Sequence, residues 1–421
     1  MNESYWSRIL TTRMSRRRAL TATGAAAAGA ALLAACGDDD EKPAGQAVTE
    51  IRIGAVVPLT GRYAAGGAQI KGGYEIAVDD INASGGVQLK GTSKKVPLKL
   101  DLLDDASDPN QTVQRLETLY SNKVAAYLGG FGSDLHAAAA PIAEKNKTPY
   151  LGVAFALYSI HQKGYKYLFS PFVKSPGITK SWFDLMDAQS PKPTKLALFI
   201  EKTDWGSELR ELWRKESSAR GYQLVSDEEY APGATDLSPL ILKAKSANAD
   251  AVLSLPSPPD GALLQRQMKE LDFNPKLTLI IRAADAPTWA TNFGKDGDYV
   301  SLFPGWSPDV KYEGVQAFST KYQQKYNVSV GAVSGPAYVA VQVLADALSR
   351  ASSLDGDSVR DALTKTDLKS SLIGPVKFNA DGTGQVAQVI VQWQNGKLVS
   401  VWPKDVAGGT LQYPAKPFKD R

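Results

Sequence analysis

Short apolar runs alternate with stretches of helical period along most of this chain. The first run, Ile51 to Val57, predicts a buried parallel strand, and residues 58–67 predict the turn after it. Apolar residues on one face predict a helix over 70–81. A strand, a glycine-rich loop and a helix form the first unit of an open α/β sheet, where ligands bind beyond the carboxyl ends of strands.

The same alternation continues to the C-terminus. Further strands are expected at 96–103, 125–129, 148–154, 195–200, 223–230, 251–255 and 277–281. Helices are expected at 109–121, from 135 onward, and at 207–219, 238–246, 262–271, 313–326, 337–349 and 358–363. The final stretch predicts a hairpin of 388–393 with 398–402 around Asn395-Gly396. This order predicts an α/β protein with parallel sheets.

Two strings near the start are more specific than periodicity. Residues 54–61 have the form G-x-x-x-P-L-T-G, and residues 73–87 have the form G-x-x-x-A-V-D-D-I-N-A-S-G-G-V. Together they resemble the leucine/isoleucine/valine-binding proteins of bacterial ABC importers. The resemblance extends from about Glu50 to the end of the chain. It implies the type I periplasmic binding protein fold, in which two doubly wound parallel-sheet α/β lobes are joined by three hinge crossings.

The resemblance also implies where the lobes begin and end. The crossings are expected near 170–176, 299–308 and 373–379. The first lobe then comprises 50–170 and 304–375, and the second comprises 171–303 and 376–421. A chain of 421 residues is long enough for two such cores. The lobes are expected to close on a small ligand by hinge motion.

Candidate ligand contacts in the first lobe follow the strand ends, beginning with Tyr63. At Gly129–Asp134, small residues let a ligand approach, and free amides of the next helix attract a carboxylate, with the Ser133 hydroxyl as a further donor. Alternatively, Ser133 only caps that helix. Relatives that bind amino acids carry a Ser-x-Ser-x-Thr string where this chain has Ala154 and Phe155. The missing hydroxyls argue against an α-amino acid, and Phe155 either stacks on a flat or apolar ligand or belongs to the core.

The second lobe offers four candidates. The family commonly places an aromatic that faces the cleft where this chain has Trp205; the alternative is packing on the lobe surface. Ser257 lies in a proline-rich loop where relatives offer ligand contacts. Arg282 and Asp285 either meet the carboxylate and ammonium groups of a ligand or pair with each other.

Charge and motifs exclude several other functions. Five arginines against one glutamate in the first 35 residues account for the net +4, and the rest is balanced at 43 basic and 43 acidic residues. A basic footprint for nucleic acid is therefore absent. The sequence has no G-x-S-x-G, H-E-x-x-H or P-loop motif, and only two histidines. We expect no enzyme activity, no cofactor and no metal site.

The N-terminal 35 residues have the pattern of an export signal. Arginines at 16–18 precede an apolar run from Ala22 to Ala35 that is too short to be a permanent membrane span. The arginines resemble a twin-arginine signal, although Ala19 replaces the usual phenylalanine and Sec export stays open. Residues 33–37 resemble a lipobox, so Cys36 is expected to be lipidated and 36–49 to form a flexible tether.

These features predict an exported, lipid-anchored, monomeric solute-binding component of an ABC importer. It would capture an amino-acid-like or carboxylate-bearing solute and deliver it to the membrane permease. A sensor of the same fold that signals to a membrane receptor is the alternative, and a secreted α/β enzyme is a remote one.

Overall fold

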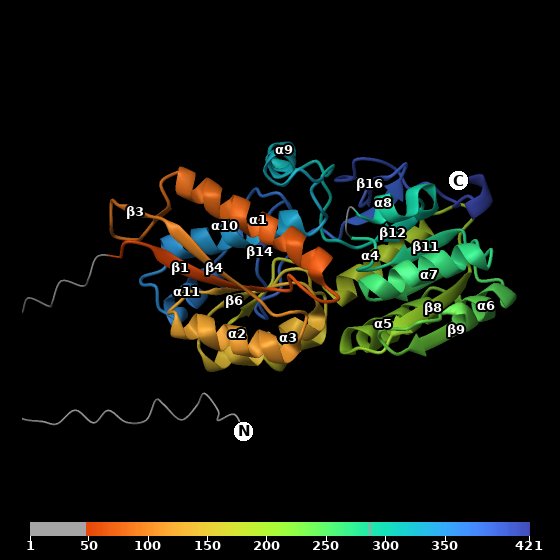
Figure 1. The fold of residues 1–421 in the computed structure, drawn as a ribbon, viewed down its shortest axis with the longest axis horizontal. Helices are drawn as coiled ribbons and strands as arrows, with labels where there is room; N and C mark the ends of the chain where they lie inside the picture. Colours follow the sequence, from red (N-terminus) through yellow and green to blue (C-terminus); the bar gives the residue numbers. More distant parts are fainter. Residues whose placement is uncertain (1–47, 286–287) are drawn as a thin grey trace, which may run out of the picture. The chain divides into compact units, whose positions relative to one another are not determined.

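The computed structural model describes residues 48–285 and 288–421 (Figure 1). The expected signal peptide and Cys36 lie outside the described residues. Residues 48–421 form one compact unit. Within it most of the strands belong to two large separate sheets, one of five strands and one of seven.

The first lobe is built on a parallel sheet in the order β4-β1-β5-β6-β7. Its strands are β1 (Ile51–Val57), β4 (Leu98–Asp104), β5 (Tyr127–Leu128), β6 (Tyr150–Leu151) and β7 (Leu168–Phe169). Its helices are α1 (Ala64–Ala83), α2 (Pro109–Ser121), α3 (Ser133–Lys145), α9 (Val315–Tyr326), α10 (Ser334–Arg350) and α11 (Gly356–Leu363). Helices α1 and α10 pack together on one face of the sheet, and α2 and α3 cover the other (Figure 1).

The second lobe contains the larger sheet, in the order β16-β15-β12-β11-β10-β8-β9. Its strands are β8 (Lys195–Glu201), β9 (Gln223–Tyr230), β10 (Ala251–Leu255), β11 (Leu277–Ile280), β12 (Val300–Leu302), β15 (Ile390–Gln394) and β16 (Lys397–Trp402). Only β15 and β16 run antiparallel to their neighbours. Its helices are α4 (Ser175–Asp187), α5 (Asp204–Ala219), α6 (Ser238–Ser246), α7 (Pro258–Glu270) and α8 (Thr288–Phe293).

Short elements complete the unit. They are the ladder of β2 (Val87–Gln88) with β3 (Lys95–Val96), the ladder of β13 (Asp367–Leu368) with β14 (Val376–Lys377), and the 3-10 helices η2 (Tyr158–Lys163), η3 (Gly294–Gly297) and η4 (Phe418–Asp420). None of the helices in the described ranges is long and apolar enough to cross a membrane.

Local sequence signals explain several element ends. The Asp108 side chain caps α2 by accepting from the amides of Asn110 and Gln111 at 2.7 and 3.1 Å, with Pro109 in the first turn. The expected hairpin is confirmed, since β15 pairs with β16 around Asn395 and Gly396, which both have positive φ. Local residue chemistry was therefore sufficient at these positions.

Three differences from the expected boundaries have a structural explanation. Helix α1 begins at Ala64, six residues earlier than expected. Gly66 and Gly67 belong to this helix instead of a turn, and they let it approach neighbouring segments closely. A Cβ on Gly67 would lie 1.8 Å from the Pro58 carbonyl oxygen. The expected strand at 96–103 is divided at Pro97, which has no amide hydrogen to donate.

The third boundary concerns the last passage between the lobes. Ser170 bridges Thr383, and the Ser170 amide donates to the Gly382 carbonyl at 2.9 Å. The segment up to residue 384 therefore stays beside β7, and the chain enters the second sheet only at β15. We therefore propose a lobe boundary at 384–390 in place of the expected one between 375 and 376. Two α/β lobes with three crossings are nevertheless what the structure contains, so the expected fold class is confirmed.

Candidate ligand-binding site

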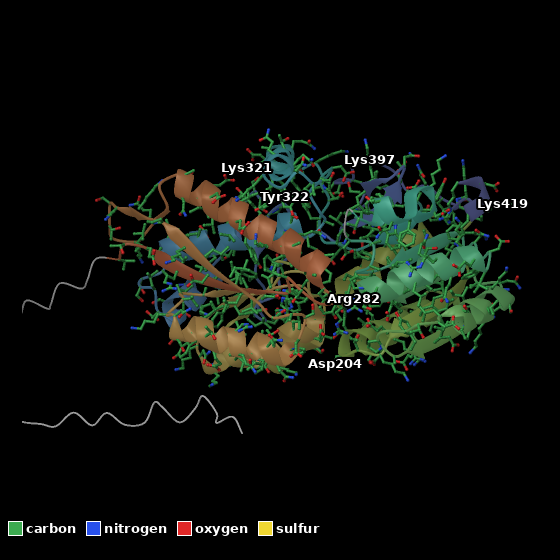
Figure 2. All side chains as sticks on the ribbon, in the orientation of Figure 1. Asp204, Arg282, Lys321, Tyr322, Lys397 and Lys419 are labelled. Carbon is green, nitrogen blue, oxygen red and sulfur yellow. The ribbon has the colours of Figure 1, made fainter. Side chains whose placement is uncertain are left out.

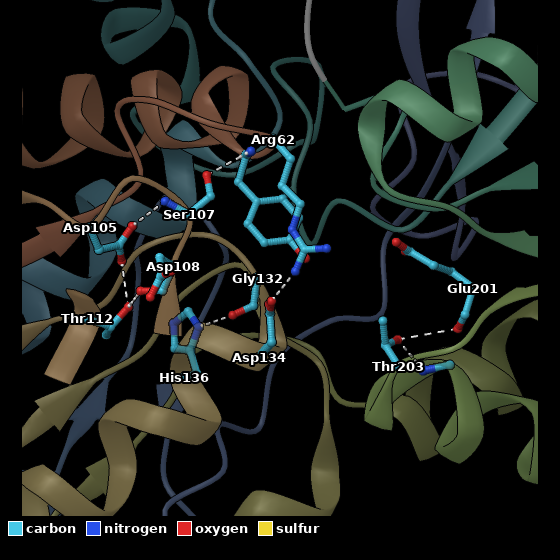
Figure 3. A network of polar contacts seen from close by, with 12 residues as sticks. Arg62, Asp105, Ser107, Asp108, Thr112, Gly132, Asp134, His136, Glu201 and Thr203 are labelled. Atoms are coloured by element: carbon cyan, nitrogen blue, oxygen red, sulfur yellow. Dashed lines mark hydrogen bonds and ion pairs between the residues drawn. The ribbon is translucent and has the colours of Figure 1, made fainter. Parts of the chain in front are cut away.

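The candidate site lies where the carboxyl ends of the strands in the two sheets face each other. Burial raises the pKa of the Tyr63 phenol, and the nearby Arg282 guanidinium of the second lobe opposes that shift. Gln69 of α1 donates to the backbone carbonyl of Asp285 at 3.4 Å. Figure 3 shows Arg62 and Asp134 on one side and Glu201 on the other. The strand-end residues of both lobes are therefore neighbours.

Tyr63 and Ser133 form the first-lobe side. Both are buried, and neither hydroxyl has a hydrogen-bond partner within the described residues. Ser133 is the first residue of α3, whose amides at this end lack partners inside the helix. The Arg62 guanidinium lies 4.6 Å from the Tyr63 ring centroid and pairs with Asp134 at 2.5 Å. This arrangement combines hydroxyl donors with a helix N-terminus, which favours a negatively charged group.

A buried ion pair dominates the second-lobe side. The Arg282 guanidinium pairs with Glu201, the last residue of β8, and its Nε donates to the Pro256 carbonyl at 3.0 Å. Burial raises the pKa of Glu201, and Arg282 opposes that shift. The φ of Arg282 is 70°, a conformation that non-glycine residues rarely adopt. Figure 2 shows Arg282 at the end of the second lobe nearest α5 and Asp204.

Asp285 does not pair with Arg282, which was one of the two expectations for these residues. Its Oδ1 has no partner in the described part of the chain, and its side chain is buried. Burial raises the pKa of Asp285 to about 7, although the nearby Arg282 lowers it. Glu201 Oε1 is also buried without a described partner. Two acceptor oxygens therefore flank the Arg282 guanidinium.

Asp285 should make the protein less stable as the pH rises. Because its folded pKa lies above its unfolded value, its stabilising contribution is complete at acid pH and is lost as the pH rises through about 7. Between pH 5 and pH 8 the parent should lose about 2 to 3 kcal/mol more of its free energy of unfolding than the Asp285→Asn variant. Urea unfolding at both pH values measures this difference, and equal losses would contradict the shifted pKa.

Trp205 and Ser257 are both close to this group. Trp205 is 6% exposed, and the Arg282 guanidinium lies 5.4 Å from its ring centroid. Its indole Nε1 donates to Ser175 Oγ at 2.9 Å. Ser257 is buried immediately before α7, and its side chain does not cap that helix. Trp205 thus forms a wall beside the ion pair.

The Phe155 ring is enclosed by other side chains of the protein. It is 1% exposed and stacks on His136 and His161, with ring centroids 4.2 and 5.7 Å apart. The Lys174 ammonium lies 3.8 Å from its centroid. Protein groups already surround this ring, so its interpretation as a core residue is the one that its packing favours. The Ala154 carbonyl is already used within the protein, because it accepts from the Gly132 amide at 3.2 Å.

Sequence reasoning did not select Arg62, Asp134, Glu201 or Tyr230 as ligand contacts. The Tyr230 hydroxyl is buried without a described partner, and burial together with the nearby carboxylates of Glu201 and Asp260 raises its pKa. Glu201 and Tyr230 are the last residues of β8 and β9. Position at the carboxyl end of a parallel strand was the signal that could have identified both.

The arrangement suits binding rather than metal chemistry. Within 48–285 and 288–421 no group of three or more His, Cys, Asp and Glu residues is placed to hold a metal ion. Unpartnered polar atoms come from both lobes: the first contributes the hydroxyls of Tyr63 and Ser133 and the carboxylate oxygen Asp134 Oδ1, and the second contributes carboxylate oxygens and a phenol. Buried polar atoms are normally hydrogen-bonded, so these atoms make this region the candidate position for a small polar molecule.

Known proteins share this architecture. The Leu/Ile/Val-binding protein homolog 7 of Brucella abortus is 27% identical over 395 residues, which cover 88% of this chain and 96% of that protein. Homolog 8 from the same organism is 25% identical over 393 residues, or 87% of this chain and 94% of that protein.

Solved structures agree on the fold. A leucine-binding protein from Thermotoga maritima superposes with a TM-score of 0.75 at 24% identity, over 85% of this chain and all of that one. A branched-chain amino acid transporter substrate-binding protein from Streptococcus pneumoniae, solved in complex with isoleucine, superposes with a TM-score of 0.73 at 22% identity. The match covers 83% of this chain and 97% of that one. A solute-binding protein from R. palustris in complex with benzoate superposes with a TM-score of 0.72 at 18% identity. The match covers 86% of this chain and 98% of that one.

The family model extends across both lobes and all three passages between them. Residues 50–397 match the model described as periplasmic binding protein. This match agrees with the resemblance that the first strand, turn and helix carry in the sequence. The chain therefore belongs to the periplasmic binding protein family.

Proposed function

We propose that this chain is the extracytoplasmic solute-binding component of an ABC importer, and that its two lobes close on a small ligand bearing an ammonium and a carboxylate group. The main support is the set of buried, unpartnered polar atoms contributed by both lobes. A ligand that contacts both lobes stabilises the closed form and leaves the open form unchanged.

Charge complementarity supports this ligand class. On the first lobe, the hydroxyls of Tyr63 and Ser133 and the amides that begin α3 would donate to a carboxylate. On the second, Glu201 Oε1 and Asp285 Oδ1 would accept from an ammonium group, beside the Tyr230 phenol and the Trp205 wall. A ligand with a carboxylate alone would leave these two acceptors without donors.

The relatives support the same class. The names of the Brucella relatives and of several solved neighbours refer to leucine, isoleucine or branched-chain amino acids, while one neighbour holds benzoate. The missing hydroxyl string near Ala154 argued against an α-amino acid. However, Ser133 and Tyr63 supply hydroxyls from other loops, so we return to an amino-acid-like solute.

A thermal-shift screen tests the ligand class directly. Protein that has been unfolded and refolded to remove carried-over ligand is screened against amino acids, aromatic acids, amides and sugars. A ligand at about 100 times its Kd should add about 2.7 kcal/mol of stability. We expect the shift from an amino acid and not from its deaminated or esterified analogue. A shift from simple carboxylates alone would contradict the zwitterionic class.

The Tyr230→Phe variant should weaken ligand binding without destabilising the free protein. The phenol has no described partner before the ligand binds, so its removal breaks no internal hydrogen bond. A lost hydrogen bond to a charged ligand group should raise Kd about 10- to 100-fold. Calorimetry measures Kd. The control is Tyr222→Phe, because the Tyr222 phenol donates to the Asp187 carboxylate at 2.9 Å and is not one of the candidate site residues. An unchanged Kd in Tyr230→Phe would remove this residue from the site.

The membrane attachment rests on the sequence alone. We propose that Cys36 carries a lipid after signal cleavage and holds the protein near its permease, with the protein as a monomer. Mass spectrometry of the membrane fraction should find diacylglycerol on the N-terminal cysteine. Recovery of the Cys36→Ser variant in the soluble exported fraction is the expected control, and membrane retention of that variant would contradict the anchor.

A further inference from the structure

The segment 155–159 of the first lobe is held by groups that begin the second lobe. The Phe155 carbonyl accepts from the Lys174 ammonium at 2.9 Å. The Ala156 carbonyl accepts from both the amide and the hydroxyl of Ser175 at 2.9 and 2.8 Å. Lys174 and Ser175 stand at the start of α4, just after the first passage between the lobes.

Helix α5 of the second lobe holds the other end of this segment. The Glu208 carboxylate accepts from the backbone amide of Tyr158 through Oε1 and from that of Ser159 through Oε2, both at 2.8 Å. Hydrogen bonds with an ionised acceptor are about twice as strong as neutral ones. Each oxygen of one carboxylate therefore binds the opposite lobe, 49 and 50 residues away in the chain.

Helix α5 connects this contact to the candidate ligand site. Trp205 and Glu208 are three residues apart on α5, and therefore on neighbouring turns of one face. Trp205 binds Ser175 Oγ and lies beside Arg282, while Glu208 binds the first lobe. Movement of α5 away from the first lobe would break both Glu208 hydrogen bonds together.

We propose that Glu208 is an interlobe clasp, a positioning residue that stabilises the closed arrangement through protein groups and without touching the ligand. The segment 155–159 then serves lobe closure, since its backbone groups are taken by Lys174, Ser175 and Glu208. The clasp sets how much of the ligand-free protein is closed, and thereby the apparent affinity. This last consequence rests on the proposed function, whereas the contact itself does not.

Ligand-free protein tests the clasp. In the full chain with Glu208→Ala, hydrogen exchange at the Tyr158 and Ser159 amides should accelerate at least about tenfold, because each loses a bond to a charged acceptor. The radius of gyration from small-angle scattering should increase as the lobes separate. Glu211→Ala, an exposed glutamate on the same helix, is the matched control and should change neither quantity.

Each outcome decides the proposal. Faster exchange with an unchanged radius would mean that Glu208 only orders the local turn, and would overturn the clasp. If Glu208→Ala does not fold, Glu208→Gln keeps a single acceptor oxygen and should show a smaller increase in both quantities; no increase would overturn the proposal. A larger radius together with no ligand from the screen would support the clasp and contradict the proposed function.

Discussion

Replacement of Arg282 by methionine is expected to lower the free energy of unfolding by about 3 to 5 kcal/mol. Arg282 and Glu201 are 5% and 0% exposed, and they pair with each other. Without the guanidinium, the Glu201 carboxylate would stay buried without the charged group that it contacts, and the Pro256 carbonyl would lose its donor. Urea unfolding followed by circular dichroism measures the loss.

Two further variants identify the cause of this loss. Arg214 pairs with Asp227 but is 51% exposed, and Asp227 keeps Arg210 as a partner, so Arg214→Met should change stability by less than about 1 kcal/mol. The double variant Arg282→Met with Glu201→Gln should recover part of the stability, because no charge is then buried alone. If Arg282→Met is no worse than Arg214→Met, the buried pair does not stabilise the fold as argued.

Lowering the pH from 7 to 4 should destabilise the parent by about 3 kcal/mol more than it destabilises the His161→Gln variant. Burial, together with the nearby positive charge of Lys174, lowers the pKa of His161 to about 3. A histidine with a depressed folded pKa contributes stability that is complete above about pH 6.5. That contribution is lost as the pH falls toward 3, because the unfolded chain takes up the proton first.

The surroundings of His161 allow a conservative substitution. Its Nδ1 donates to the Asp381 carbonyl at 2.8 Å, a bond that a glutamine amide can also make, and its ring stacks on Phe155. Urea unfolding at pH 4, 5, 6 and 7 measures both proteins, and other titrating groups such as Asp285 are common to them. Parallel pH profiles would show that His161 becomes protonated within the folded protein.

His136 offers an independent repeat of the same comparison. It is fully buried, and burial lowers its pKa to about 3 as well. The chain has only two histidines, so a variant lacking both removes every histidine contribution to the acid sensitivity. What acid sensitivity remains then belongs to the carboxylates and to Lys174, whose pKa burial lowers.

Much of the fold was predictable because its signals are local. Apolar runs identified the buried strands, Asp108-Pro109 marked the start of α2, and Asn395-Gly396 marked the hairpin. Each signal depends on residues within a few positions of each other. Gly66 and Gly67 misled because their role is close packing against Pro58 and Phe131, which no local pattern contains.

The candidate site was predictable only in part. Tyr63, Ser133, Trp205, Arg282 and Asp285 were selected from their positions after strands and from the family resemblance, and the structure brings that edge of both sheets together. The function of each side chain depends on its partner. The Arg282–Glu201 contact joins residues 81 apart, and Phe155 packs on histidines at 136 and 161.

The sequence by itself determined the α/β architecture and the family, because hydrophobic period, turn residues and the strings at 54–61 and 73–87 are properties of contiguous residues. Only the tertiary structure decided which buried polar groups are paired and which have no described partner. It also decided that Glu208 binds the opposite lobe. Pairing, burial and the pKa shifts that follow from them depend on distances between residues far apart in the chain, and periodicity contains no information about those distances.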